Sequence, residues 1–263
     1  MIQIDIEKCI GCKACEKDCP GRAIKVTDGK AQSVKKCILC GHCVAICPKN
    51  AVSIPDYDMA DVEEYDPATF HLDPETYLRA VKFRRSIRNF TDEPIPRDKM
   101  ERILNAGRYT ATAMNLQDCR FILVQERLEE FRDLVWQEMP HVLEYLQYTD
   151  RNWHFMFSRF YDRYQKNPKN DTLLFNCTAF LLIASNDRLD GGLAAANIEN
   201  MAVAEGAGAL YSGYMMRMVG ESMLLKEWLG IDDKQIACCM LLGYPDVTYK
   251  RTAPRRKADI IWK

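Results

Sequence analysis

The spacing of hydrophobic positions changes along the chain. Apolar residues alternate with polar ones over residues 2–6, which predicts a short N-terminal strand. Short apolar patterns over 24–26 and 52–54 predict two partner strands for it. From residue 77 onward, apolar residues recur at helical spacing. The pattern therefore predicts a small strand-and-loop region followed by a larger region with helices.

The second region carries both helical and strand patterns. Asp73-Pro74-Glu75 provides a helix N-cap, a proline at the first helical position and an acid in the first turn, so a helix should begin there. The other predicted elements are a helix from about Pro96, strands over 119–124, 179–184 and 240–244, a helical stretch over about 126–165 and a helix from Asn197 to about Met218. These elements follow one another without regular βαβ repetition, which predicts an α+β fold.

An acidic stretch separates the two regions. No Lys or Arg occurs from Asn50 to Leu78, whereas eight acidic residues and three prolines do. This composition predicts an extended, solvated connector, with an acidic docking site for a basic electron donor as the alternative. We therefore expect a first domain over 1–57, an acidic linker over 58–75 and a second domain over 76–263.

Composition and charge exclude several classes of protein. The chain has 263 residues and a net charge of −1, so nothing in its overall charge predicts binding to nucleic acid or to an anionic membrane. No apolar run is long enough to span a bilayer, and the N-terminus lacks the features of a signal peptide. These features predict a cytoplasmic protein.

Eight of the twelve cysteines lie between Cys9 and Cys47. The pattern Cys-x2-Cys-x2-Cys-x3-Cys-Pro occurs there twice, from Cys9 and again from Cys37, 28 positions later. Three closely spaced thiolates can surround one iron–sulfur cube, and the fourth, followed by proline, reaches the neighbouring cube. Structural zinc is the alternative, but it uses neither the third cysteine of each run nor the trailing Cys-Pro.

Crossed ligation of this kind defines two expected ligand sets. They are Cys9, Cys12, Cys15 and Cys47 for the first cluster, and Cys37, Cys40, Cys43 and Cys19 for the second. Residues 1 to about 57 resemble the bacterial ferredoxins that carry two 4Fe–4S clusters. The other four cysteines, Cys119, Cys177, Cys238 and Cys239, lie in apolar stretches and are expected to be small core residues.

An ordered series of motifs follows the linker. It consists of Arg84-Arg85-Ser86-Ile87-Arg88-x-Phe90, the stretch 108–117 ending in Asn115-Leu116-Gln117, the Gly-rich stretch 205–213, and Gly243-Tyr244-Pro245 followed by the basic stretch 254–257. In this order the motifs resemble the nitroreductase family of FMN enzymes over residues 76–263. The resemblance implies an α+β FMN-binding domain and a homodimer with FMN at the interface.

FMN carries a phosphate dianion, ribityl hydroxyls and amide-like ring edges, which call for guanidinium, hydroxyl and amide partners. A solvated basic helix end is the alternative interpretation of the Arg84–Arg88 segment by itself. The resemblance implies that Thr112, Asn115 and Gln117 reach the flavin of the partner subunit. The full set of expected FMN-binding residues is Arg84, Arg85, Ser86, Arg88, Thr112, Asn115, Gln117, Tyr211, Ser212, Gly213, Arg255 and Lys257.

A ferredoxin domain fused to a flavin domain predicts an iron–sulfur flavoprotein oxidoreductase. Electrons from a low-potential donor would pass through two 4Fe–4S clusters to FMN, which would reduce a nitroaromatic, a quinone or an activated alkene. The donor would be a ferredoxin, a flavodoxin or NAD(P)H, and no protein side chain is assigned as the catalytic group. Two alternatives remain open: an electron carrier or redox sensor without small-substrate turnover, and a flavin enzyme with other chemistry, such as dehydrogenation or reductive dehalogenation.

Overall fold

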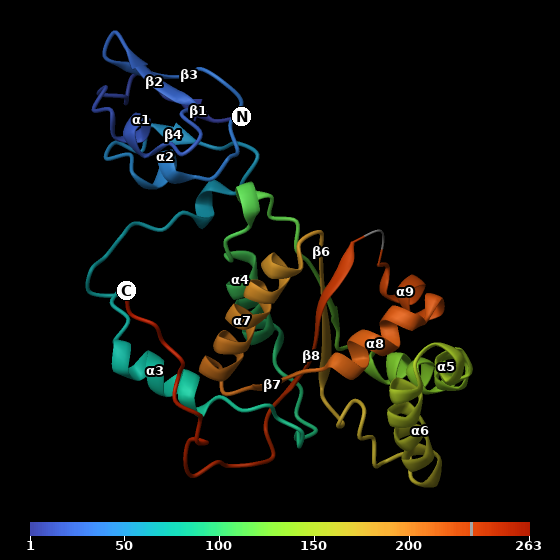
Figure 1. Ribbon diagram of the computed structural model, residues 1–263. Coiled ribbons are helices and arrows are strands. Elements are labelled where there is room, and N and C mark those ends of the chain that lie inside the picture. The colour runs from blue at the N-terminus through green and yellow to red at the C-terminus, as the bar shows by residue number, and fades with distance from the viewer. Residues whose placement is uncertain (232–233) are drawn as a thin grey trace. The chain divides into compact units, whose positions relative to one another are not determined.

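The computed structural model describes residues 1–231 and 234–263, which divide into two compact units (Figure 1). Unit 1 contains residues 1–71 together with Thr112–Gln117. Unit 2 contains residues 72–111 and 118–263. The chain therefore returns to unit 1 for six residues after unit 2 has begun.

Unit 1 is built from two short antiparallel ribbons and two short helices. Strand β1 (Gln3–Ile4) pairs with β4 (Val52–Ser53), as the alternating pattern predicts. Strand β2 (Ile24–Thr27) instead pairs with β3 (Lys30–Ser33), so its predicted pairing with the N-terminal strand is wrong. Asp28 and Gly29 both have positive φ, which closes a tight hairpin between β2 and β3. Helices α1 (Ala14–Asp18) and α2 (His42–Ala45) follow the two cysteine loops.

The core of unit 1 is small and includes cysteine side chains. Ile2, Ile24 and Val52 form its apolar centre, against which Cys9 and Cys15 pack. So small a core stabilises a fold only weakly, so metal–thiolate bonds are needed to supply much of the folding free energy. After β4 the chain forms one short 3-10 helix, η1 (Met59–Asp61), and no further regular element until α3.

Unit 2 is organised around a four-stranded sheet in which all neighbours are antiparallel. The strand order is β5-β6-β8-β7, with β5 (Arg120–Val124), β6 (Ala179–Ser185), β8 (Gln235–Gly243) and β7 (Gly208–Tyr211). All seven residues of β6 are buried, because helices cover both faces of the sheet. The prediction of an α+β fold is confirmed.

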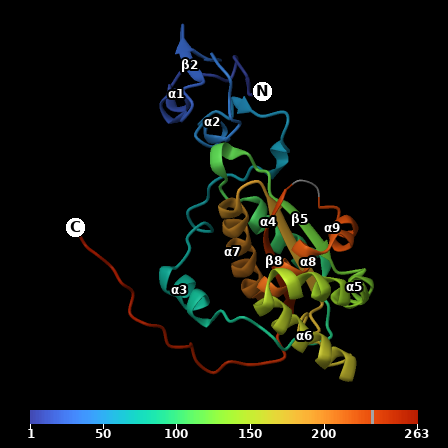
Figure 2. The ribbon, with the colours of Figure 1, turned by 45° about the vertical axis from the view of Figure 1, so that its right-hand side comes forward.

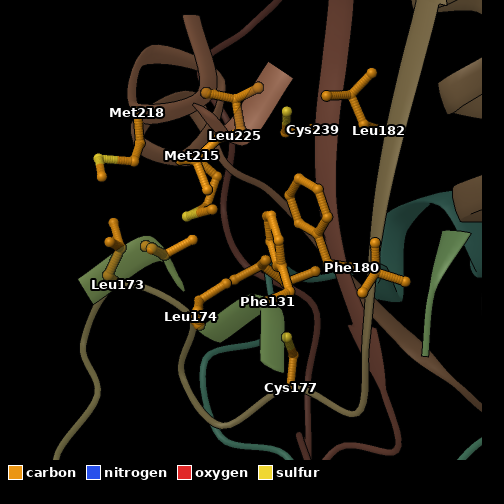
Figure 3. Close-up of a cluster of buried hydrophobic side chains, with 14 of the residues drawn as sticks. Phe131, Leu173, Leu174, Cys177, Phe180, Leu182, Met215, Met218, Leu225 and Cys239 are labelled. Carbon is orange, nitrogen blue, oxygen red and sulfur yellow. The ribbon is translucent and has the colours of Figure 1, made fainter. Parts of the chain in front are cut away.

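The two faces of the sheet carry separate cores. Helices α4 (Arg97–Arg108) and α7 (Arg188–Ala204) pack on one face, and α5 (Leu128–Thr149), α6 (Arg151–Lys166), α8 (Gly213–Glu221) and α9 (Met223–Leu229) belong to the core on the other (Figures 1 and 2). Figure 3 shows the second core, where Phe131 from α5 lies against Phe180 from β6 with ring centroids 4.8 Å apart. Alternate residues of β6 enter the two cores, as a strand with period two requires.

One predicted element of unit 2 is wrong. The chain does not form a single helix from Asn197 to Met218, because α7 ends at Ala204 and β7 and α8 follow it. Gly206 has φ +77°, which a helix cannot accommodate, and it turns the chain into β7. The turn could not be predicted from the Ala- and Gly-rich composition, since alanine favours a helix on either side of it.

The other predicted elements of unit 2 are present. Helix α3 (Pro74–Phe83) begins where predicted, with the Asp73 carboxylate accepting a hydrogen bond from the Thr76 backbone N–H at 2.7 Å. The predicted helical stretch over 126–165 is divided into α5 and α6 at Asp150, which caps α6. Among the described residues, no helix has the length and apolar character needed to cross a membrane.

Candidate functional site

The four cysteines predicted to hold the first cluster line one cavity in unit 1. Cys9, Cys12, Cys15 and Cys47 surround it, together with apolar side chains such as Val26 and Val52. Three of these thiols come from the first cysteine run and Cys47 comes from the second, which is the grouping that crossed ligation requires. The donor set and its apolar wall fit an iron–sulfur cluster, because thiolates are its ligands and low polarity limits access of water.

Three cysteines of the second set, Cys37, Cys40 and Cys43, lie in the second loop and at the start of α2. Burial, and then the negative charges of Cys37 and Cys40, raise the pKa of the Cys43 thiol to about 11. Cys19 follows α1, and its sulfur accepts a hydrogen bond from the Ala23 backbone N–H at 3.1 Å. His42, the first residue of α2, is exposed, and its Nδ1 atom lies 3.0 Å from the Cys40 sulfur.

Backbone N–H groups point at several of the sulfurs. The N–H of Ala31 donates to Cys9 at 3.4 Å, that of Leu39 to Cys37 at 3.3 Å, and that of Ala51 to Cys47 at 3.3 Å. Such bonds stabilise the thiolate form, and those from Ala31 and Gly11 lower the pKa of Cys9. Hydrogen bonds to ligand sulfurs also help to set the reduction potential of a cluster.

Within the described part of the chain, no three His, Cys, Asp or Glu side chains are grouped to hold a single metal ion. In a cubane cluster each thiolate binds a different iron, so its ligands surround a cavity.

The segment 84–90, which is predicted to bind the flavin, lies beside β7. The Ile87 backbone N–H donates to the Ala209 carbonyl at 3.1 Å, and Ser86 forms a parallel bridge with Ala209. The segment therefore runs along the same strand that leads into Tyr211, Ser212 and Gly213. Gly208 makes this approach possible, because a Cβ atom there would lie 2.4 Å from Cγ1 of Ile87.

The three arginines of this segment differ in their surroundings. Arg84 is 26% exposed and forms an ion pair with Glu199 of α7 at 3.2 Å. The guanidinium groups of Arg85 and Arg88 donate to carbonyl oxygens of their own segment at 3.5 Å, the outer limit for a hydrogen bond. Arg85 is partly exposed and Arg88 is exposed, so both can reach an anion at the surface.

Glu199 connects the arginine segment to the end of β7. Burial raises the pKa of the Glu199 carboxyl, although the Arg84 charge and hydrogen bonds from Arg84 and Tyr211 oppose that effect. Burial and the nearby Glu199 charge also raise the pKa of the Tyr211 hydroxyl. Arg84, Glu199 and Tyr211 therefore form one polar cluster, and Tyr211 is still 38% exposed.

The remaining predicted flavin residues are distributed over several parts of the chain. Ser212 is buried and caps α8 by accepting from the Met215 N–H at 3.2 Å, and the exposed Gly213 begins that helix. Arg255 and Lys257 are exposed in the C-terminal segment, which has no helix or strand. Thr112, Asn115 and Gln117 belong to unit 1.

Comparison with known families places both parts of the chain. Residues 81–244 match the model of the nitroreductase family. The chain belongs to the nitroreductase family. Residues 1–48 match the model of the 4Fe–4S dicluster domain, which confirms the predicted resemblance and the prediction of two clusters. A comparison with curated proteins finds no significant match.

Solved structures share the fold of unit 2, which is called the nitroreductase unit from here on. A nitroreductase with bound FMN from Desulfitobacterium hafniense is 20% identical, covers 70% of this chain and 97% of its own, and has a TM-score of 0.54. A nitroreductase with bound FMN from Bacteroides fragilis is 18% identical over 71% of this chain and 98% of its own, with a TM-score of 0.56. An iodotyrosine deiodinase bound to FMN and 3-iodo-L-tyrosine is 16% identical over 71% of this chain and 98% of its own, with a TM-score of 0.51.

Two polar residues that position parts of the predicted sites were not identified from the sequence. Glu199 lies in the Ala-rich α7 of the nitroreductase unit, and its sequence signal is an acid among the small and apolar residues of the helix face that it shares with the buried Asp190. Lys30 donates from Nζ to the carbonyl oxygens of Ile6 and Cys9, both at 2.7 Å, and so holds the first cysteine loop. Cys177, Cys238 and Cys239 are buried core residues, as predicted, and Cys119 is partly buried.

Proposed function

We propose that this nitroreductase-family protein is an iron–sulfur flavoprotein oxidoreductase. It takes electrons from a low-potential donor through two 4Fe–4S clusters, passes them to FMN and reduces an organic acceptor. The observation that carries the proposal is the cavity lined by Cys9, Cys12, Cys15 and Cys47 in the same chain as a nitroreductase unit. The two parts are chemically complementary, because iron–sulfur clusters transfer single electrons and a flavin exchanges either one or two electrons.

The proposed ligands are the two crossed sets of cysteines. Cys9, Cys12, Cys15 and Cys47 hold the first cluster, and Cys37, Cys40, Cys43 and Cys19 hold the second. Burial and like charges raise the pKa of Cys15 and Cys43, so iron binding must displace their protons. Such clusters favour a reducing, oxygen-poor cytoplasm as the setting.

The proposed FMN site lies at the junction of the arginine segment and β7. Arg85 and Arg88 bind the phosphate as charged donors, and Ser86 and the Tyr211–Gly213 turn contact the rest of the cofactor. Arg84 orients the segment through Glu199. When bound, FMN supplies the electron-transfer chemistry, while the protein positions it and limits access of water.

A homodimer completes this proposal. Helix α3 has no buried residue although Tyr77, Leu78 and Val81 form an apolar side, and Trp262 near the C-terminus is 89% exposed. Figure 2 shows the C-terminal segment extending away from the sheet of unit 2. A second copy would bury both apolar surfaces. Arg255 and Lys257, which are exposed in the same C-terminal segment, close on the flavin phosphate.

The acceptor is a nitroaromatic, a quinone or an activated alkene, and the donor is a reduced ferredoxin, a flavodoxin or NAD(P)H. The test combines an anaerobic panel of these acceptors and donors with binding of FMN to variants. Arg85→Ala and Arg88→Ala should each weaken FMN binding by about 1.5–3 kcal/mol, the contribution of a charge-assisted hydrogen bond. Arg97→Ala is the matched control, because Arg97 is an exposed arginine of unit 2 paired with Glu101.

Wild-type affinity for FMN in both test variants would refute the assigned phosphate site. Flavin reduction without consumption of any acceptor would favour an electron carrier over an enzyme.

A further inference from the structure

The six residues Thr112–Gln117 form a compact loop in unit 1, although the chain on both sides of them belongs to the nitroreductase unit. Met114, Asn115 and Gln117 have positive φ values of 50°, 56° and 49°. The Gln117 backbone N–H donates to the Thr112 hydroxyl oxygen at 2.9 Å and closes the loop. The conformation is therefore strained locally and held by specific contacts.

The side chain of Asn115 bonds to the second cysteine loop. Its amide nitrogen donates to the carbonyl oxygens of Ile38 at 3.2 Å and Leu39 at 3.0 Å. These two residues lie between Cys37 and Cys40, two of the proposed ligands of the second cluster. Asn115 is partly buried, so water competes only in part for these bonds.

One of the two bonds acts on a peptide group that also contacts a ligand sulfur. The Ile38 carbonyl and the Leu39 N–H belong to the same peptide group, and that N–H donates to the Cys37 sulfur at 3.3 Å. A hydrogen bond to a carbonyl polarises its peptide group and strengthens the N–H as a donor. A stronger N–H···S bond stabilises the reduced cluster and raises its potential.

The first cysteine loop is supported differently. Gly11 occupies the position equivalent to Leu39, 28 residues earlier, and has φ +63°. Glycine adopts this conformation without strain, whereas Leu39 adopts φ +54° with a side chain. The second loop therefore needs an outside contact to hold its turn, and Asn115 supplies one.

We propose that Asn115 is a positioning residue for the second cluster, through which the Thr112–Gln117 loop sets that cluster's reduction potential. A loop that belongs to unit 1, but comes from a later part of the chain than the cysteines, thereby controls the energy at which electrons leave the second cluster. This inference rests on the proposed function, since it assumes that the eight cysteines hold two clusters.

The test is a redox titration of the anaerobically purified holoenzyme, followed by electron paramagnetic resonance. Asn115→Gly removes the donor and tolerates φ +56°. Tyr57→Phe is the matched control, because it removes the hydrogen bond that Gln117 donates to the Tyr57 hydroxyl at 3.0 Å and leaves the cysteine loop untouched. We expect Asn115→Gly to lower the midpoint potential of one cluster and leave the other unchanged, and Tyr57→Phe to change neither.

A second variant separates polarisation from support of the turn. Adding Leu39→Gly to Asn115→Gly relieves the strain at position 39 but restores no donor, so the lowered potential should persist. Unchanged potentials in Asn115→Gly, or an equal fall of both potentials, would overturn the assignment. Full recovery with Leu39→Gly would overturn the polarisation of the peptide group and leave support of the turn as the way in which Asn115 acts. Because the titration follows the clusters directly, its outcome does not depend on whether FMN binds. Absence of the clusters would instead refute the proposed function itself.

Discussion

Replacing Arg84 by Ala should lower the free energy of unfolding of the nitroreductase unit, because the buried Glu199 carboxylate then loses its ion-pair partner. The Arg84 guanidinium lies 3.2 Å from Glu199, whose side chain is only 10% exposed. Removing one partner of a buried ion pair destabilises a protein by about 3–5 kcal/mol. Because solvent reaches about a quarter of Arg84, we expect a smaller loss, about 2–3 kcal/mol at pH 8.

The loss should depend on pH in a defined direction. Burial raises the pKa of Glu199 in the folded protein above its usual value of 4.5. A group of this kind contributes stability that is fully present below its unfolded pKa and is lost as pH rises through the folded pKa. Without Arg84 the folded pKa rises further, so the carboxyl stays protonated to higher pH. Arg84→Ala should therefore be close to wild type near pH 5 and clearly less stable at pH 8.

Urea unfolding followed by tryptophan fluorescence provides the assay. All four tryptophans of the chain lie in unit 2, so the signal reports on that unit alone. The double variant Arg84→Ala/Glu199→Gln removes the charge and should recover most of the lost free energy of unfolding at pH 8. Any loss caused by weaker FMN binding would remain in the double variant. An equal loss at both pH values, or no recovery in the double variant, would refute this reasoning.

Three further predictions concern other parts of the molecule. Cys12→Ala should abolish turnover driven by a reduced ferredoxin but leave reduction of the acceptor by dithionite-reduced FMN intact, and survival of both activities would place the clusters off the electron path. Gly208→Ala should lower the free energy of unfolding by about 1–3 kcal/mol, because its Cβ would lie 2.4 Å from Ile87, whereas Gly192→Ala, which meets nothing within 4 Å, should not destabilise. Removal of residues 258–263, which include the exposed Ile260, Ile261 and Trp262, should shift the protein toward monomer in analytical ultracentrifugation, and an unchanged dimer would exclude this segment from the interface.

The parts of this structure that depend on neighbouring residues could be predicted from the sequence. The spacing of the cysteines follows from how a short loop can surround a cluster, so the family comparison agrees with it. Asp73 and Pro74 marked the start of α3 because capping depends on neighbouring residues. The short apolar runs that form β5 and β6 and the long helical pattern that contains α5 could be predicted in the same way.

Features that depend on contacts between residues far apart in the sequence could not be predicted. Strand β7 follows an Ala-rich helix, and pairing with β8, rather than local propensity, selects its conformation. Asn115 contacts Leu39, 76 residues away, so the motif alone gave no sign of a role at the second cysteine loop. The ion pair between Arg84 and Glu199 likewise joins residues 115 positions apart.

The most direct test of the account is the cofactor content of the anaerobically purified protein. Iron, acid-labile sulfide and flavin should be measured on the same sample, together with its visible spectrum. The account predicts about eight irons, about eight sulfides and one FMN per chain. Eight irons without flavin would contradict the oxidoreductase and favour an electron carrier or sensor, and one or two zinc ions in place of iron would contradict the cluster assignment itself.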